Sequence, residues 1–166
     1  MHHPSHTTQS QEQIVPSATN HLFCAIRTWT AIEHITLTNL SFPSDALGIH
    51  GPLASNAPLL PVIPSLRSLY LGQATLLPPS AIAAMVCLPD QDSLEEVRLV
   101  DAYRESIWGP RIRRSDIERA AGGLVAKGNE DQRNALIDKV RRLVRCEAKT
   151  ERIIGGDRVE GLTTLD

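Results

Sequence analysis

The sequence has no apolar run that approaches the roughly 18 residues of a membrane span. Its first residues also lack the basic-then-apolar order of a secretion signal. Three cysteines, Cys24, Cys87 and Cys146, are widely separated, and no Cys-x-x-Cys pair occurs. An odd number of isolated cysteines is typical of reduced intracellular thiols, each serving as a small core residue. We therefore expect a soluble protein of the cytoplasm or nucleus, with no membrane partner.

The sequence also lacks an excess of either charge. Its 17 basic and 19 acidic residues nearly cancel, which argues against a protein that binds nucleic acid electrostatically. The charges are unevenly spread, because three basic residues precede position 100 and fourteen follow it. The acids follow the same trend, so we interpret the second half as a mixed-charge solvated surface and expect no nucleic-acid partner.

Common catalytic motifs are missing as well. The chain contains no Gly-x-Ser-x-Gly elbow, no phosphate-binding Gly-Lys-Ser/Thr loop and no His-Glu-x-x-His. Glu33 and His34 are neighbours on a predicted strand, so they should point to opposite faces and not act as a pair. The sequence predicts a non-enzymatic protein with no catalytic residue, cofactor or metal site.

A small metal-binding or hydrolytic protein stays open as an alternative. Met1-His2-His3 could hold Cu(II) or Ni(II) through a free amino terminus. We interpret these residues as part of a floppy polar tail, because any chain that begins this way would bind such metals adventitiously.

The clearest pattern present is an L-x-x-L-x-L spacing that occurs three times. Its apolar residues are Ile32, Ile35 and Leu37, then Leu66, Leu69 and Leu71, then Leu94, Val97 and Leu99. The three copies start 34 and 28 residues apart, near the 20–29 residues of leucine-rich repeats, with an insertion in the first unit. A chance match in a leucine-rich αβ chain is the alternative.

The remaining elements are predicted from hydrophobic periodicity, helix-capping residues and the positions of proline and glycine. Four helices are expected, over 17–29, 81–88, 115–125 and 129–143. Ser80 should cap the second helix, and a Ser115/Glu118 capping box should begin the third. Asp138 and Arg142 should form an ion pair on the fourth. The Pro- and Gly-rich segment 45–64 should be a loop. Residues 145–153 should form a last strand, with Cys146 and Ala148 at the positions where leucine is expected.

The predicted fold class is α/β, a short leucine-rich-repeat-like solenoid. Its parallel strands should form one face, with helices and loops on the other. Residues 1–16 are expected to be a disordered tail, 17–154 the repeat-like domain and 155–166 a loose C-terminal end.

Parallel stacking of the three strands would align their outward residues in rows roughly 4.8 Å apart. The predicted rows are His34, Ser68 and Glu96, then Thr36, Tyr70 and Arg98, then Thr38, Gly72 and Val100. A cation–π contact is expected between Tyr70 and Arg98. A polar face with one aromatic residue is typical of a protein-binding surface, and the alternative is a row of merely solvated strand residues. The predicted partner-binding residues on this concave face are His34, Thr36, Thr38, Ser68, Tyr70, Glu96 and Arg98.

Several segments of the sequence resemble the C-terminal part of fungal, basidiomycete-type F-box-like leucine-rich-repeat proteins. They are Trp29–Leu40, Ile63–Ala74, Leu94–Tyr103 with Ser106–Pro110, and Cys146–Ile153. The similarity runs from about Leu22 to Gly161 and consists of repeat phrases, without a catalytic motif.

The resemblance implies a role in ubiquitin ligation. In such proteins an F-box docks on the adaptor of a cullin–RING ubiquitin ligase, and the repeats hold a protein substrate. No F-box segment precedes the repeats in this sequence, so the adaptor is an expected partner only if an F-box exists elsewhere. We expect a non-enzymatic protein-interaction module, the substrate-binding repeat half of such a receptor, whose protein ligand is unidentified. A truncated remnant without a partner is the alternative.

Overall fold

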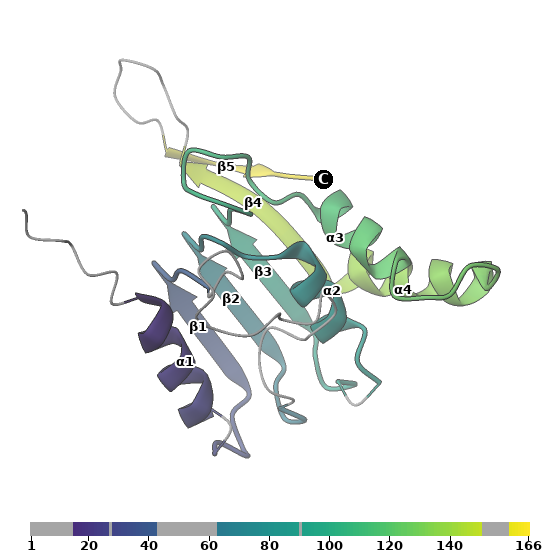
Figure 1. Ribbon diagram of the computed structural model, residues 1–166, viewed down its shortest axis with the longest axis horizontal. Coiled ribbons are helices and arrows are strands. Elements are labelled where there is room, and N and C mark those ends of the chain that lie inside the picture. Colours follow the sequence, from purple (N-terminus) through teal and green to yellow (C-terminus); the bar gives the residue numbers. More distant parts are fainter. Residues whose placement is uncertain (1–14, 27, 43–62, 90, 151–159) are drawn as a thin grey trace, which may run out of the picture.

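A single five-stranded sheet organises the molecule (Figure 1). The computed structural model describes residues 15–26, 28–42, 63–89, 91–150 and 160–166. The strands lie in chain order and are β1 (His34–Thr38), β2 (Ser68–Gly72), β3 (Glu96–Val100), β4 (Val144–Thr150) and β5 (Glu160–Thr164). Strands β1 to β4 run parallel, and β5 pairs antiparallel with β4. The expected α/β class with parallel strands is confirmed.

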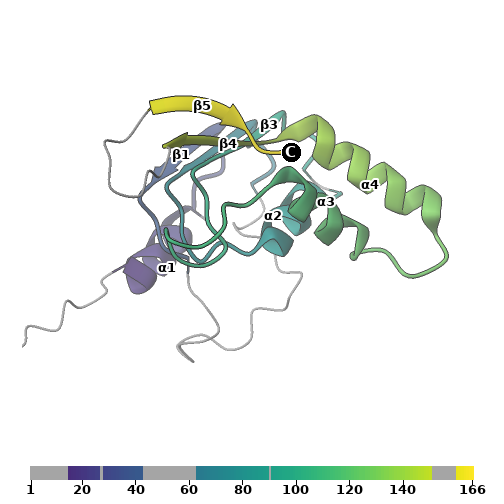
Figure 2. The ribbon, with the colours of Figure 1, turned by 90° about the horizontal axis from the view of Figure 1, so that it is seen from above.

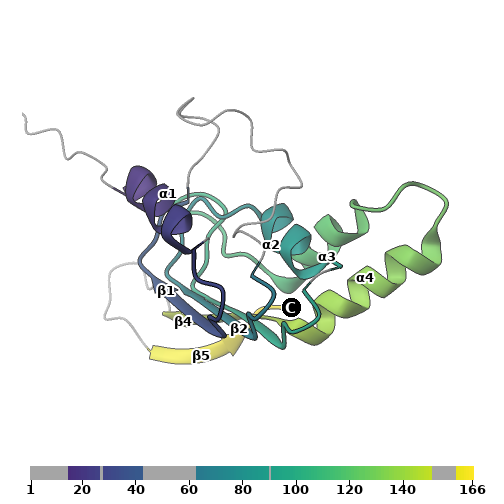
Figure 3. The ribbon, with the colours of Figure 1, turned by 90° about the horizontal axis from the view of Figure 1, so that it is seen from below.

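Helices lie on one side of this sheet. They are α1 (Val15–Ile26), α2 (Pro79–Val86), α3 (Arg114–Gly122) and α4 (Glu130–Leu143). Two views at right angles to Figure 1 show α1, α2 and α3 under the same face, while α4 extends beyond the end of the sheet and leads directly into β4 (Figures 2 and 3). None of the described helices covers the opposite face, which we call the open face.

The predicted equivalence of the three L-x-x-L-x-L segments is confirmed by the register. Ile35 pairs with Leu69, and Leu69 pairs with Val97. All three side chains are at most 5% exposed and belong to one apolar core on the helix side. Strand alternation therefore sends the intervening residues to the open face.

The chain also turns in the same way after each of these strands. Asn39, Gln73 and Asp101 immediately follow β1, β2 and β3, and their φ angles are 55°, 51° and 51°. Residues other than glycine adopt this left-handed conformation rarely. Each of the three donates its backbone N–H to a carbonyl of the next strand. The same turn geometry after three strands shows that the segments are equivalent in backbone as well as in side-chain pattern.

Two helix starts differ from the predicted ones. Helix α2 begins after Pro78, not after Ser80, because Pro79 occupies the first helical turn, where proline's missing N–H costs no hydrogen bond. Helix α3 begins at Arg114, so the expected Ser115/Glu118 capping box is wrong. The Asp116 carboxylate instead accepts the backbone N–H of Arg113 at 3.0 Å.

The other boundaries shift by a few residues. Helix α1 ends at Ile26, before the expected Trp29. Asp138 pairs with Arg141 and not with Arg142. Helix α4 does begin after Asn129, whose side chain accepts from the Gln132 N–H.

The C-terminal strands also depart from expectation. Val144 pairs with Val97 and Cys146 pairs with Leu99, so the positions equivalent to leucine lie two residues earlier than predicted. Residues 160–164 form β5, where the sequence predicted a loose end.

Some predictions fall on residues that the structure does not describe. These are the predicted polar tail over 1–14 with its histidines, residues 45–62 of the predicted loop, and residues 155–159 of the predicted loose end. Within the described ranges, none of the helices is both long enough and apolar enough to cross a membrane.

Candidate protein-interaction surface

The structure brings the predicted outward residues together on the open face. His34 pairs with Ser68 and Ser68 with Glu96, while Thr36 pairs with Tyr70 and Tyr70 with Arg98. These two rows are exposed or half-buried, as a binding surface requires. In the third row only Thr38 is exposed, because Gly72 and Val100 are both buried.

Tyr70 lies at the centre of this face and leans along its strand. A Cβ atom added at Gly72 would lie 3.0 Å from Tyr70 Cε1 and 3.1 Å from the Thr38 methyl group. The tyrosine ring can therefore lie against Gly72 only because this residue has no side chain. Arg98 covers the ring from the neighbouring strand, with its guanidinium carbon 5.8 Å from the ring centre. The predicted cation–π contact is confirmed.

Arg98 is held from its other side by Glu147. Its Nε donates to Glu147 Oε2 at 2.7 Å, and the glutamate side chain is only 11% exposed. This hydrogen bond raises the pKa of Arg98 above its ordinary value. A charge-assisted bond to a largely buried carboxylate fixes the guanidinium in one position.

Strand β4 extends the surface with residues that sequence reasoning missed. Arg145 Nε lies 3.3 Å from Glu96 Oε1, and Glu147 holds Arg98. The sequence predicted a last strand from position 145, and Arg145 does lie on β4, but neither Arg145 nor Glu147 was assigned to the binding surface. Cys146 and Ala148 had been predicted to point inward, so strand alternation could have assigned positions 145 and 147 to the open face.

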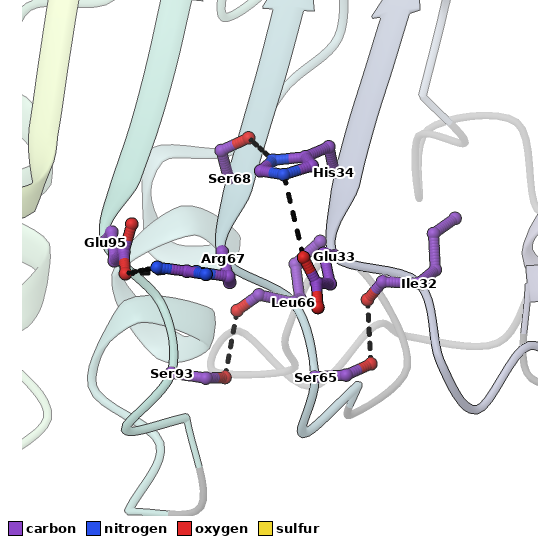
Figure 4. A network of polar contacts seen from close by, with 9 residues as sticks. All are labelled: Ile32, Glu33, His34, Ser65, Leu66, Arg67, Ser68, Ser93 and Glu95. Atoms are coloured by element: carbon purple, nitrogen blue, oxygen red, sulfur yellow. Dashed lines mark hydrogen bonds and ion pairs between the residues drawn. The ribbon is translucent and has the colours of Figure 1, made fainter.

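A second polar cluster lies at the start of the strands (Figure 4). His34 Nδ1 is 2.7 Å from Ser68 Oγ, and His34 Nε2 is 3.9 Å from Glu33 Oε2. The expectation that Glu33 and His34 point apart is wrong, because Glu33 precedes the first residue of β1 and does not follow strand alternation.

The two backbone N–H groups beside this serine, histidine and glutamate cluster are already bonded. A serine nucleophile needs N–H donors that stabilise the developing oxyanion. The backbone N–H groups of Arg67 and Ser68 both donate to the Glu33 carbonyl, so they are already used. Over the described part of the chain, no group of three or more metal-binding side chains occurs either. We interpret the cluster as part of a polar surface.

Charged and hydroxyl groups also fasten the strand starts to one another. Arg67 Nη2 lies 2.5 Å from Glu95 Oε1, and this hydrogen bond raises the pKa of Arg67. Ser65 Oγ donates to the Ile32 carbonyl at 2.7 Å, and Ser93 Oγ donates to the Leu66 carbonyl at 3.0 Å and to the Pro64 carbonyl. Both serines immediately precede the first apolar residue of a repeat segment. That shared position in the sequence could have identified them.

The opposite ends of the strands are fastened by a buried carboxylate. Asp101 is 2% exposed, and its oxygens accept from the Thr150 N–H at 3.1 Å, the Thr150 hydroxyl at 3.0 Å and Arg111 Nε at 2.9 Å. It therefore ties the turn after β3 to the end of β4. The open face is held at both ends by polar contacts between neighbouring strands.

No family model, curated protein or solved structure matches this chain.

Proposed function

We propose that this chain is a leucine-rich-repeat-like, non-enzymatic protein-interaction module that binds a protein ligand on its open face. The observation that carries the proposal is the placement of Tyr70. It is a half-buried aromatic side chain on a face of parallel strands that none of the described helices covers, and it is held between Gly72 and Arg98. Tyrosine and arginine, together with tryptophan, are enriched among the residues that dominate protein–protein binding energy.

Preorganisation supports this function. Tyr70 and Arg98 are held in place by neighbouring groups before any ligand arrives, so binding loses less side-chain freedom. The remaining rows supply hydroxyl and carboxylate groups that can form the polar contacts of an interface.

The charge distribution favours a protein over nucleic acid as the ligand. Arg67, Arg98 and Arg145 each lie against a glutamate. Paired arginines do not present the positive field that attracts a phosphate backbone.

The repeat-like spacing and the resemblance to F-box-like proteins favour one class of ligand. By that resemblance the ligand is a substrate of a ubiquitin ligase. A cullin–RING adaptor is a further partner only if an F-box is supplied elsewhere.

Affinity capture with matched variants tests the proposal. Tyr70→Ala and Arg98→Ala remove the centre of the face, and Asn134→Ala alters an exposed position on α4. We expect one set of proteins to bind the wild type and the α4 variant, and to be lost from both face variants. Equal capture by all four proteins would contradict a role for the open face.

A further inference from the structure

Strand β1 ends the sheet with backbone groups that point away from β2. The Glu33 carbonyl accepts from the Arg67 and Ser68 N–H groups, and the Asn39 N–H donates to the Gly72 carbonyl. In a strand, the N–H and C=O of one residue point to the same side, and successive residues alternate. Residues 33, 35, 37 and 39 therefore bond to β2. The N–H and C=O groups of His34, Thr36 and Thr38 point to the other side, where the described residues provide no strand.

The apolar core is also less covered at this edge. Leu37 is half-buried, whereas its register neighbours Leu71 and Leu99 are 0% and 1% exposed. Leu40 is likewise half-buried, although the equivalent Ala74 is 1% exposed. A structure that adds a strand to β1 would bury more of both leucines.

Nothing in β1 itself opposes pairing. Protected edge strands usually carry lysine, proline or a bulge. The five residues of β1, His-Ile-Thr-Leu-Thr, contain no lysine or proline and pair with β2 without a break in register. The side chains of His34, Thr36 and Thr38 are all exposed.

We infer that β1 pairs with β1 of a second copy of this chain, in antiparallel orientation around a two-fold axis at Thr36. That axis places Thr36 opposite Thr36 of the other copy and His34 opposite Thr38. Every outward N–H and C=O of the three residues then has a partner. The contact is isologous, because both copies use the same residues. Threonine pairs opposite each other are favourable across strands. The core-facing Ile35 and Leu37 meet their counterparts on the helix side.

A second copy fits this edge better than an unrelated charged segment. Strand β1 has no Asp, Glu, Lys or Arg, so two copies meet without like-charge repulsion. Both open faces lie on the same side of the joined sheet, so the dimer leaves the surface around Tyr70 available to a ligand. The inference is independent of the proposed function.

Sedimentation velocity of the full chain from low to high micromolar concentration tests the dimer. Thr36→Pro removes only an outward N–H, and proline is tolerated in edge strands, so the ladder to β2 should survive. We expect the wild type to dimerise and Thr36→Pro to weaken the dimer by about tenfold or more. Thr36→Val, which keeps the N–H, should dimerise like the wild type.

A charge pair identifies the two-fold contact directly. Thr36→Lys and Thr36→Glu should each be monomeric, because like charges meet at the axis, and their mixture should form a heterodimer. This pair decides the question even where Thr36→Pro fails to fold. A wild-type chain that stays monomeric at every concentration overturns the inference, and so does a dimer that Thr36→Pro, Thr36→Lys and Thr36→Glu leave unchanged.

Discussion

The guanidinium of Arg98 lies over the ring of Tyr70, with 5.8 Å between its central carbon and the ring centre. The two residues occupy directly opposite positions on β2 and β3. Glu147 on β4 holds the same guanidinium at 2.7 Å. Three successive strands thus contribute to one fixed aromatic and cationic group on the open face.

The Arg98–Glu147 bond should contribute measurably to stability. Glu147→Gln keeps the shape of the side chain and removes its charge. We expect this variant to lose about 1 kcal/mol in free energy of unfolding, less than a fully buried charged bond because Arg98 is 38% exposed. Urea unfolding measures the loss. Glu96→Gln is the matched control, since its partner Arg145 is 67% exposed, and an equal loss in both variants would contradict the special role of Glu147.

Asp101 should be the most sensitive polar residue in the fold. Asp101→Ala leaves Arg111 without its carboxylate and puts alanine at a φ of 51°. We expect a loss of about 3 kcal/mol or more, measured by chemical unfolding. Asp101→Asn, which tolerates this φ and keeps one acceptor oxygen, should lose less. An alanine variant within about 1 kcal/mol of the wild type would show that Asp101 does not tie β3 to β4.

The two serines at the strand starts should contribute by similar amounts. Ser65→Ala and Ser93→Ala each remove a hydroxyl that donates to a carbonyl of the preceding segment. We expect each to lower the free energy of unfolding by about 1 kcal/mol. Ser115→Ala, at an exposed position of α3, is the control and should cost nothing. If Ser93→Ala and the control Ser115→Ala have the same thermal unfolding midpoint, the hydroxyl of Ser93 does not stabilise the sheet.

Burial raises the pKa of the Cys146 thiol from its ordinary value of 9.0 to about 12. The unfolded chain therefore releases this proton at lower pH than the folded chain. Stability from the neutral thiol is complete below pH 9 and is lost as the pH rises towards about 12. Relative to Cys146→Ala, the wild type should lose about 1 kcal/mol between pH 8 and pH 10.

Thiol labelling provides a second measurement of the same burial. Cys24 is exposed and Cys146 is buried. We expect an alkylating reagent at pH 8 to modify Cys24 quickly and to modify Cys146 only after unfolding. Rapid labelling of both cysteines in the folded protein would place Cys146 outside the core.

Sequence periodicity predicted the centre of this fold well. The positions of Ile35, Leu69 and Val97 follow from one spacing, because a strand with one buried face repeats every two residues. That register also placed Tyr70 beside Arg98. The seven predicted surface residues lie on one face, with Gly72 making room for the tyrosine ring.

The parts that sequence reasoning missed depend on contacts between distant residues. The turn at Asp101 is stabilised by Thr150, which lies 49 positions further along the chain. Glu147 meets Arg98 because β4 pairs with β3, and no local pattern in the sequence encodes that pairing. Strand β5 has a short polar sequence that does not by itself predict a strand. It is ordered because it pairs with β4.

Site-specific photo-crosslinking tests directly whether a protein ligand contacts the open face at Tyr70. A benzophenone amino acid placed at Tyr70 keeps an aromatic ring on the open face, and the same group at Asn134 reports on α4. We expect irradiation in cells to join a specific protein to position 70 and not to position 134, and we expect Arg98→Ala to abolish the product. Identical products at both positions, or none at position 70, would contradict a binding role for the open face.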